Sequence, residues 1–334
     1  MPVEHLLLAA MTGYMKKTLG IITVLLSMYC MVTAQPVKEH GKLHITGTQL
    51  TDEHGNAVIL RGMSYGWHNL WPRFYNGKSV EWLHKDWGCT VVRAAMGVEL
   101  NDSGYIKQPR FSTQRIEAVV DGAIKQGIYV IIDWHCHNIQ TAAAKDFFAK
   151  MAAKYGKYPN VIYEVYNEPD YEHWTEVKEY STEVIKTIRA ADPDNIILVG
   201  NPHWDQDINL VANEPLTGFN NIMYTVHYYA ATHKQWLRDR CDSALSKGIP
   251  IFISESAGME ASGDGPLNVE EWNKWIDWCE NHKISWITWS VSDKNETCSV
   301  LQKSASSDGG WKESDLKESG VIIRNKLRAF ANLR

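Results

Sequence analysis

The sequence predicts a closed (β/α)8 barrel, a TIM barrel, in one domain. Eight apolar, β-rich runs recur along the chain, and amphipathic helical stretches separate them. No Ser/Gly-rich linker or internal repeat divides the sequence. Strands and helices that alternate in this way favour a barrel of parallel strands.

The expected strands are recognised by their near-continuous apolar character. Parallel strands that are buried on both faces have this pattern, whereas half-exposed strands alternate apolar and polar residues. The eight segments are residues 58–63, 90–96, 129–135, 161–168, 195–201, 222–228, 251–255 and 285–290.

Two of the intervening segments show the helical period most clearly. Within residues 115–127, Ile116 and Val119 belong to one apolar stripe, and Gly127 is suited to end the helix. Residues 176–190 repeat the pattern. The alternative fold, an open doubly wound sheet, needs a Gly-rich phosphate-binding turn after its first strand. The segment at that position, MSYGWHNLWP, lacks GxGxxG, so we expect the closed barrel.

Residues 1–34 have the pattern of a secretory signal peptide. Lys16 and Lys17 precede the apolar run LGIITVLLSMYCMV, and the small residue Ala34 suits cleavage. The run is short for a membrane anchor, and a lipid-modified Cys30 is the minor alternative. We therefore expect a signal peptide at 1–34 and a barrel domain at 35–334. Met15 is the natural start of the signal, so residues 1–14 would be either an upstream start-site artefact or a long amino-terminal region of the signal. The product would be secreted, extracellular or periplasmic, with no stable membrane span.

The composition narrows the class of partner. The chain has 34 Lys and Arg against 39 Asp and Glu and no basic run, so we expect no nucleic-acid partner. The 6 cysteines form no CxxC pair, which argues against a zinc site or a disulfide framework. Trp is frequent, at 14 residues, and flat amphipathic rings suit the faces of sugars. An uncharged partner fits best.

Two glutamates are expected at the mouth of the barrel. Glu168 ends the fourth strand just before Pro169, which cannot donate to a sheet, and Glu255 ends the seventh strand. Barrel enzymes carry their reacting groups at these strand ends. A pair of acids in one cleft is what cleavage of a glycosidic bond requires, and a retaining mechanism predicts a separation of about 5 to 5.5 Å.

Glu164 has the same strand parity as Glu168 but lies four residues earlier. At about 3.3 Å per residue it would be roughly 13 Å deeper in the barrel, where substrate cannot reach. We expect a buried structural acid, which needs a basic partner, either Arg93 or Arg61.

Seven segments, in order, carry a resemblance to a known family. They are LRGMS (60–64), VVRAAM (91–96), IIDWH (131–135), VIYEVYNEP (161–169), VHYYA (226–230), PIFISESAG (250–258) and WSVSDKNET (289–297). The sequence resembles the secreted endo-β-1,4-glucanases of glycoside hydrolase family 5, retaining cellulases on a (β/α)8 barrel. The resemblance implies no cofactor, a monomer, and β-1,4-glucan polysaccharides or cello-oligosaccharides as substrates.

The resemblance also implies catalytic roles. Glu168 would be the general acid and then base, and Glu255 the nucleophile. Asn167 would hold the 2-hydroxyl of the reacting sugar. Arg93 would keep Glu255 ionised, and Tyr229 would donate to the same carboxylate. From its apolar sequence neighbours we expect Glu168 to have a raised pKa, and Glu255 the opposite.

Further positions are expected to contact sugar. By the resemblance, His135 and His227 would line the subsite of the reacting sugar, Trp289 would pack on a ring, and Lys294 and Glu296 would reach its hydroxyls. Candidates from the loop after the first strand and from other strand ends are Trp67, His68, Trp71, Trp134 and Trp204. The tryptophans at 272, 275 and 278 have helical spacing and are expected in the core.

Several alternatives stay open. The stretch 133–137 (DWHCH) resembles a metal cluster, but metal-dependent barrel hydrolases place this pair on the first strand. We therefore expect no metal, and we expect Cys136 and His137 to be ordinary loop residues. A non-catalytic carbohydrate-binding barrel is the rival from another class. A related β-mannanase, xyloglucanase or mixed-linkage glucanase is the rival within the enzyme class.

Overall fold

The computed structural model describes residues 35–100 and 102–332, and within them the expected barrel is present. The predicted signal peptide lies outside the described residues. The barrel strands are β3 (Arg61–Tyr65), β4 (Val91–Gly97), β5 (Tyr129–His135), β6 (Val161–Glu164), β7 (Ile197–Val199), β8 (Ile222–Tyr229), β9 (Ile251–Ala257) and β10 (Trp286–Val291). They are parallel and close in the order β10-β3-β4-β5-β6-β7-β8-β9.

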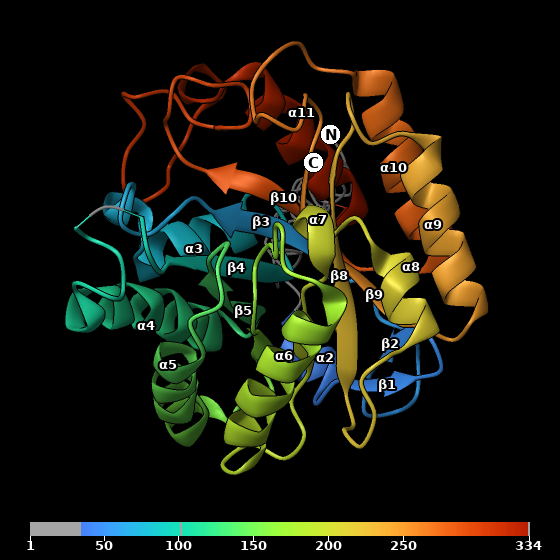
Figure 1. The fold of residues 1–334 in the computed structure, drawn as a ribbon. Helices are drawn as coiled ribbons and strands as arrows, with labels where there is room; N and C mark the ends of the chain where they lie inside the picture. The colour runs from blue at the N-terminus through green and yellow to red at the C-terminus, as the bar shows by residue number, and fades with distance from the viewer. Residues whose placement is uncertain (1–34, 101, 333–334) are drawn as a thin grey trace, which may run out of the picture. The chain divides into compact units, whose positions relative to one another are not determined.

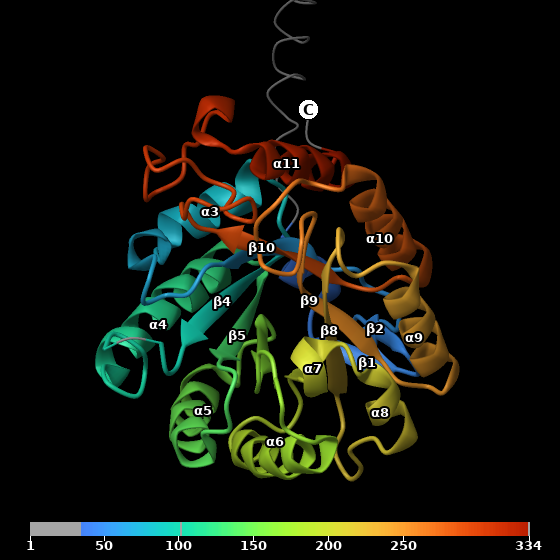
Figure 2. The ribbon, with the colours of Figure 1, turned by 45° about the horizontal axis from the view of Figure 1, so that its top comes forward.

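Helices follow the strands and surround the barrel (Figures 1 and 2). The longer helices are α3 (Gly77–Lys85), α4 (Pro109–Gln126), α5 (Thr141–Tyr155), α6 (Trp174–Arg189), α8 (Ile208–Asn213), α9 (Gln235–Ser246), α10 (Val269–His282) and α11 (Glu318–Phe330). The shorter elements are α2 (Pro36–His40), α7 (Pro202–Asp205) and the 3-10 turns η1 (Pro72–Phe74) and η2 (Glu313–Asp315).

A small hairpin closes the bottom of the barrel. Its strands β1 (His44–Thr46) and β2 (Gln49–Thr51) pair antiparallel. Leu43 and Leu50 pack in one buried cluster with Val91 and Tyr129, the first residues of β4 and β5. This apolar cluster covers the ends at which the strands begin. The opposite ends, at the carboxyl side of the strands, are therefore the ones available for a site.

The predicted helix at 115–127 is confirmed and longer than expected. Helix α4 starts with Pro109 in its first turn, a position where the missing N–H costs nothing. It ends at Gly127, whose φ of 69° is left-handed and favours glycine. The predicted helix at 176–190 corresponds to α6.

Some strand boundaries differ from the prediction. The first strand begins at Arg61 because Val58 and Leu60 belong to the cluster under the barrel. The fourth strand ends at Glu164, so the prediction that it runs to Glu168 is wrong.

The core accounts for most of the large aromatic side chains. Trp272, Trp275 and Trp278 are 1%, 0% and 8% exposed, as expected for a helix that packs on a barrel. The cysteines at 89, 136, 241, 279 and 298 are buried free thiols. Among the helices described, none has the length and apolar character needed to cross a membrane.

Candidate active site

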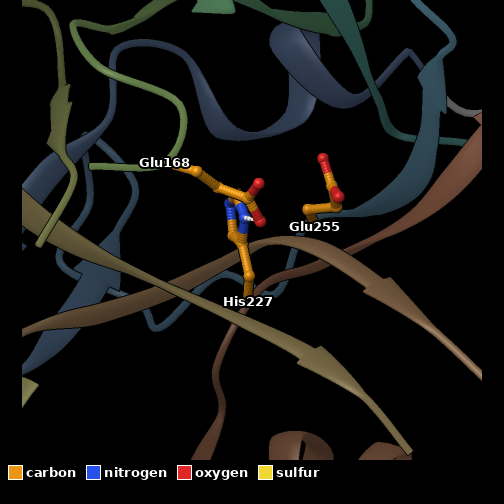
Figure 3. Close-up of side chains that lie close together, drawn as sticks. All are labelled: Glu168, His227 and Glu255. Carbon is orange, nitrogen blue, oxygen red and sulfur yellow. Dashed lines mark hydrogen bonds and ion pairs between the residues drawn. The ribbon is translucent and has the colours of Figure 1, made fainter. Parts of the chain in front are cut away.

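Glu168 and Glu255 meet at the carboxyl end of the barrel. Glu255 lies on β9 beside His227 of β8, and Glu168 follows β6. An oxygen of each carboxylate and a nitrogen of His227 all lie within 4.8 Å of one another. Figure 3 shows the Glu168 carboxylate beside the His227 ring, with Glu255 next to them. This separation is close to the value of about 5 to 5.5 Å predicted for a retaining pair, and shorter than the roughly 6.5 to 9.5 Å of inverting pairs.

The chain between Glu164 and Glu168 leaves the regular strand for a geometric reason. Glu164 and Asn167 both contact Arg93, although residues three apart on a regular strand point to opposite faces. The segment stays beside β5, since Asn167 N–H donates to the carbonyl of Trp134 at 3.1 Å. The irregular segment thus turns both Glu164 and Asn167 toward Arg93 and leaves Glu168 on the wall of the hollows at the mouth.

Arg93 is the centre of a buried network. Its guanidinium contacts Oε2 of Glu255 through Nη1 at 2.9 Å and Oδ1 of Asn167 through Nη2 at 2.7 Å. Deeper in the barrel, Nε contacts Oε2 of Glu164 at 2.7 Å, and Nη2 lies 2.9 Å from Oδ2 of Asp133. The expected contact of Arg93 with Glu255 is confirmed, and Arg93 rather than Arg61 is the partner of Glu164.

The nucleophile candidate is held at both oxygens. Tyr229 Oη donates to Oε1 of Glu255 at 2.7 Å while Arg93 holds Oε2. Two donors fix the carboxylate in one orientation and favour its charged form. Asn167 uses its carbonyl oxygen for Arg93, and its amide Nδ2 is buried without a hydrogen-bond partner among the described residues. This donor is therefore not used by the protein residues around it.

The acid candidate has two histidine neighbours. His227 Nδ1 lies 2.9 Å from Oε1 of Glu168, and His137 Nδ1 lies 3.8 Å from its other oxygen. The prediction that His137 is an ordinary loop residue is therefore wrong. Glu168 keeps 14% of its side chain exposed, so it is open to a substrate at the mouth.

The pKa directions at the two acids differ from the expectation. Burial raises the pKa of Glu168, but the hydrogen bond and charge of His227 outweigh it, so the pKa is lowered. The pKa of Glu255 is raised by burial and by the negative charge of Glu168, against the opposing effects of His227, Arg93 and Tyr229. The two carboxyls and the imidazole share protons as one group. If His227 lost its proton, Glu168 would lose the main positive charge beside it. Glu255 would still have the positive charge of Arg93 beside it.

One hollow beside the acids has an aromatic wall. Trp289 stacks on His135 with 5.1 Å between ring centroids, and the edge of Trp67 meets the same histidine at 4.4 Å. Asp133 Oδ2 holds Nδ1 of His135 at 2.7 Å. Lys294 and Glu296 form an ion pair at 2.5 Å. The hollow is lined by Trp67, Trp71, His135, Glu168, Tyr229, Glu255, Trp289, Lys294 and Glu296, among others.

A second hollow adjoins the first at Glu168 and Tyr229, which line both. Trp204 stands on its wall and is 36% exposed. Tyr171, which is 78% exposed, meets Trp204 at a steep angle with centroids 5.7 Å apart. The two hollows together form a path for an extended chain across the acids.

Two expected sugar contacts are wrong. His68 is completely buried, where Nε2 bonds the Ser112 hydroxyl at 2.8 Å and Nδ1 accepts from the N–H of Gly97 at 2.9 Å. Trp134 is also buried, and it packs against Phe147 on the outer face of the barrel. Both positions follow or end a strand, but their side chains point away from the mouth.

Three polar residues around the acids, Asp133, Ser254 and Asp205, were not predicted as site residues. Asp133 could have been found, because it has the parity of His135 on the same strand. Ser254 contacts His227 from β9, and Asp205 reaches the same histidine from α7. Asp205 belongs to a short irregular turn, so no sequence periodicity indicated its position. Glu168, His227 and Glu255 are close enough to surround a small cation. Both His227 nitrogens already have protein partners, and we assign no metal to them.

The family comparison matches most of the barrel. The model of the family described as Cellulase (glycosyl hydrolase family 5) matches residues 51–295. Endoglucanase 5 of Pectobacterium carotovorum subsp. carotovorum is 44% identical over 328 residues, which cover 95% of this chain and 64% of that protein. The chain thus spans under two thirds of the length of that relative.

Solved structures agree with this match. A structure from Cytophaga hutchinsonii superposes with a TM-score of 0.87 at 45% identity, over 89% of this chain and 97% of that one. The catalytic domain of Thermobifida fusca endoglucanase Cel5A, in complex with cellotetraose, has a TM-score of 0.84 at 34% identity. The superposition covers 88% of this chain and 100% of the Cel5A domain.

Proposed function

The chain belongs to glycosyl hydrolase family 5, and we propose that it is a retaining endo-β-1,4-glucanase in which Glu168 is the acid and base and Glu255 the nucleophile. The observation that carries this proposal is the short distance between the two carboxylates at the junction of the hollows. Such a gap leaves no room for a water on the far side of the sugar, so a carboxylate itself must attack.

In the first step Glu255 attacks the anomeric carbon. Arg93 and Tyr229 orient its carboxylate for this attack. The glycosidic bond breaks as the bond from the carbon to Glu255 forms, and Glu168 gives its proton to the leaving oxygen. The amide Nδ2 of Asn167, which has no hydrogen-bond partner among the described residues, would bind a hydroxyl of the reacting sugar, a contact that strengthens in the transition state.

In the second step water replaces the leaving chain. Glu168, now a carboxylate, takes a proton from this water, and the water oxygen bonds to the anomeric carbon as Glu255 leaves. Two displacements restore the original configuration. His227 holds Glu168 in place during both steps.

The substrate is proposed to be a β-1,4-linked glucan chain. Aromatic side chains in both hollows offer flat faces for successive sugar rings. The relatives are named endoglucanases, and the Cel5A structure contains cellotetraose. We also propose that the protein acts as a monomer and is secreted, on the pattern of residues 16–34. Sequencing the amino terminus of the exported protein would test the cleavage site.

The decisive experiment measures reducing ends released from carboxymethyl cellulose. Wild type should release them, and Glu255→Gln and Glu168→Gln should each lose at least about a hundredfold in rate. Both variants should still bind cello-oligosaccharides. Proton NMR of the first product should show the β-anomer before mutarotation.

Other outcomes would favour the rivals. Binding without any release by wild type would identify a carbohydrate-binding barrel. A higher rate of release from mannan, xyloglucan or mixed-linkage glucan than from carboxymethyl cellulose would identify a β-mannanase, xyloglucanase or mixed-linkage glucanase instead. An initial α-anomer would contradict the retaining mechanism.

A further inference from the structure

His227 connects Glu168 to two buried side chains on the other side of its ring. Its Nδ1 faces the carboxylate of Glu168 (Figure 3) and lies 2.9 Å from Oε1. Its Nε2 faces Ser254 Oγ at 2.9 Å and Oδ2 of Asp205 at 3.3 Å. Ser254 and Asp205 are completely buried. The histidine therefore has no free nitrogen, and its proton arrangement is set by these neighbours.

The Ser254 hydroxyl determines which nitrogen carries a proton. This hydroxyl has one hydrogen, which it donates to Oε1 of Glu164 at 2.8 Å. Glu164 is bound by Arg93 as a carboxylate and can only accept. Ser254 Oγ must then accept from His227, so Nε2 of His227 is protonated.

With Nε2 protonated, the contact between His227 and Glu168 contains one proton. Either Glu168 is a carboxylic acid that donates to a bare Nδ1, or His227 is an imidazolium that donates to a carboxylate. Both forms store the proton that the acid step delivers. Any group that stabilises this proton on the pair therefore keeps Glu168 able to protonate the leaving oxygen.

Asp205 is held against His227 by an unusual turn. His203, Trp204 and Asp205 in α7 all have positive φ, of 54°, 55° and 61°. Residues other than glycine rarely adopt this backbone conformation. The N–H of Asn201 donates to Oδ1 of Asp205 at 2.6 Å, and Thr225 Oγ1 donates to Oδ2 at 2.6 Å. The turn directs Asp205 into the barrel while Trp204 lines the second hollow.

We propose that Asp205 is a positioning residue which, through Nε2 of His227, keeps the shared proton on the Glu168–His227 pair. This rests on the proposed function, because it assigns the pair as the acid. A negative charge 3.3 Å from Nε2 stabilises either protonated form of the pair relative to the deprotonated one.

The charges around His227 agree with this role. Glu168 faces Nδ1, Glu164 and Asp205 face Nε2, and Glu255 and Arg93 lie nearby. Burial lowers the pKa of His227, but the charge of Asp205 leads the opposing effects, and the pKa is raised. Burial raises the pKa of Asp205 itself to about 8. Its negative charge therefore develops as the pH rises through about 8, the direction in which the pair would otherwise lose its proton.

The test compares wild type with Asp205→Asn, which keeps the shape and removes the charge. We expect the alkaline limb of kcat/KM on cello-oligosaccharides to move to lower pH by about one unit or more. Dinitrophenyl β-cellobioside, whose leaving group needs no proton, should show no such shift. Nitrogen NMR of His227 should show Nε2 protonated in wild type, and a lower titration midpoint in the variant.

Two further variants make the test specific. Asp192→Asn changes another completely buried aspartate, one that binds Tyr163 Oη at 2.8 Å, and should leave the pH profile unchanged. If Asp205→Asn does not fold, Thr225→Val takes its place. This variant removes a donor to Asp205 and should shift the alkaline limb in the same direction.

An unchanged limb together with an unchanged His227 midpoint would overturn the proposal. Equal losses on both substrates without a pH shift would also overturn it. If wild type cleaves neither substrate, the proposed function fails, and the NMR midpoints still decide the role of Asp205.

Discussion

Arg93 binds Glu164 through both Nε and Nη2, at 2.7 and 3.2 Å, and neither side chain is exposed to solvent. A bidentate contact of this kind fixes the plane of the guanidinium. The same guanidinium reaches Glu255 and Asn167 at the mouth. Glu164 thus fixes the guanidinium that holds Glu255 and Asn167, although Glu164 itself lies too deep to contact substrate.

Replacing Glu164 by Gln should destabilise the fold by about 3 to 5 kcal/mol, because the change leaves a buried guanidinium short of one negative partner. Urea unfolding followed by fluorescence would measure this loss. Asp308→Asn, which breaks an exposed pair with Lys78, should leave the midpoint unchanged. A Glu164→Gln protein as stable as wild type would show that Asp133 and Glu255 alone satisfy Arg93.

The barrel and its centre followed from regular patterns. Apolar runs predicted the strands, and strand parity placed Glu164 on the inner face, where its burial required a basic partner. His227 and Glu255 are register partners on neighbouring strands, because parallel pairing brings equivalent positions together. Residues of this kind can be predicted because a strand has only two faces.

The remaining features depend on loops and on distant neighbours. Asp205 reaches His227 only because three residues adopt positive φ, which no sequence period reveals. The loop after β3 turns Trp67 toward the hollow and His68 into the core, and sequence spacing does not distinguish the two. The pKa of Glu168 was expected to be raised because no basic residue is near it in sequence. His227, 59 positions away, reverses that direction.

Tyr229→Phe should lower kcat/KM by about 10- to 100-fold. The change removes the hydrogen bond of 2.7 Å to Glu255, and a hydrogen bond to a charged group is worth about 1.5 to 3 kcal/mol. Steady-state kinetics on an aryl cellobioside would measure the effect. The neighbouring Tyr228→Phe is a matched control, since Tyr228 stacks on Trp275 of α10 with centroids 4.2 Å apart. Equal losses in both variants would mean that the tyrosines act through packing.

The folded protein should lose stability as the pH falls below about 6.5. Burial lowers the pKa of His68 to about 3 and that of His233 to about 4, from an ordinary value of 6.5. Between those values the unfolded chain binds protons that the folded chain does not. The contribution of the two neutral histidines is therefore complete above pH 6.5 and is lost as the pH falls through this window, by a few kcal/mol in order of magnitude.

The effect of His68 can be separated by substitution. Nδ1 of His68 accepts from the N–H of Gly97, which protonation would prevent. His68→Gln should destabilise the protein most at pH 7, and the difference from wild type should shrink toward pH 4. Urea midpoints at several pH values would measure it. A difference that stays constant with pH would show that His68 is not buried in its neutral form.

Trp204→Ala should weaken binding of long substrates more than that of short ones. Glu255 and Trp289 line one hollow, whereas Trp204 lines the other, which contains Glu168 without Glu255. In the proposed mechanism this second hollow would hold the leaving chain. Trp204 is 36% exposed, so a sugar could cover only part of its face, and a loss of about 1 kcal/mol, or roughly fivefold in KM, is expected for cello-oligosaccharides. An aryl cellobioside, which extends little beyond the cleaved bond, should show a smaller change.

Trp236→Ala is the control for this prediction. It removes a tryptophan of similar exposure, 40%, that does not line either hollow, and it should leave both KM values unchanged. Equal increases in KM for the two substrates would mean that the substitution disturbs the turn at Asp205 instead of removing a sugar contact.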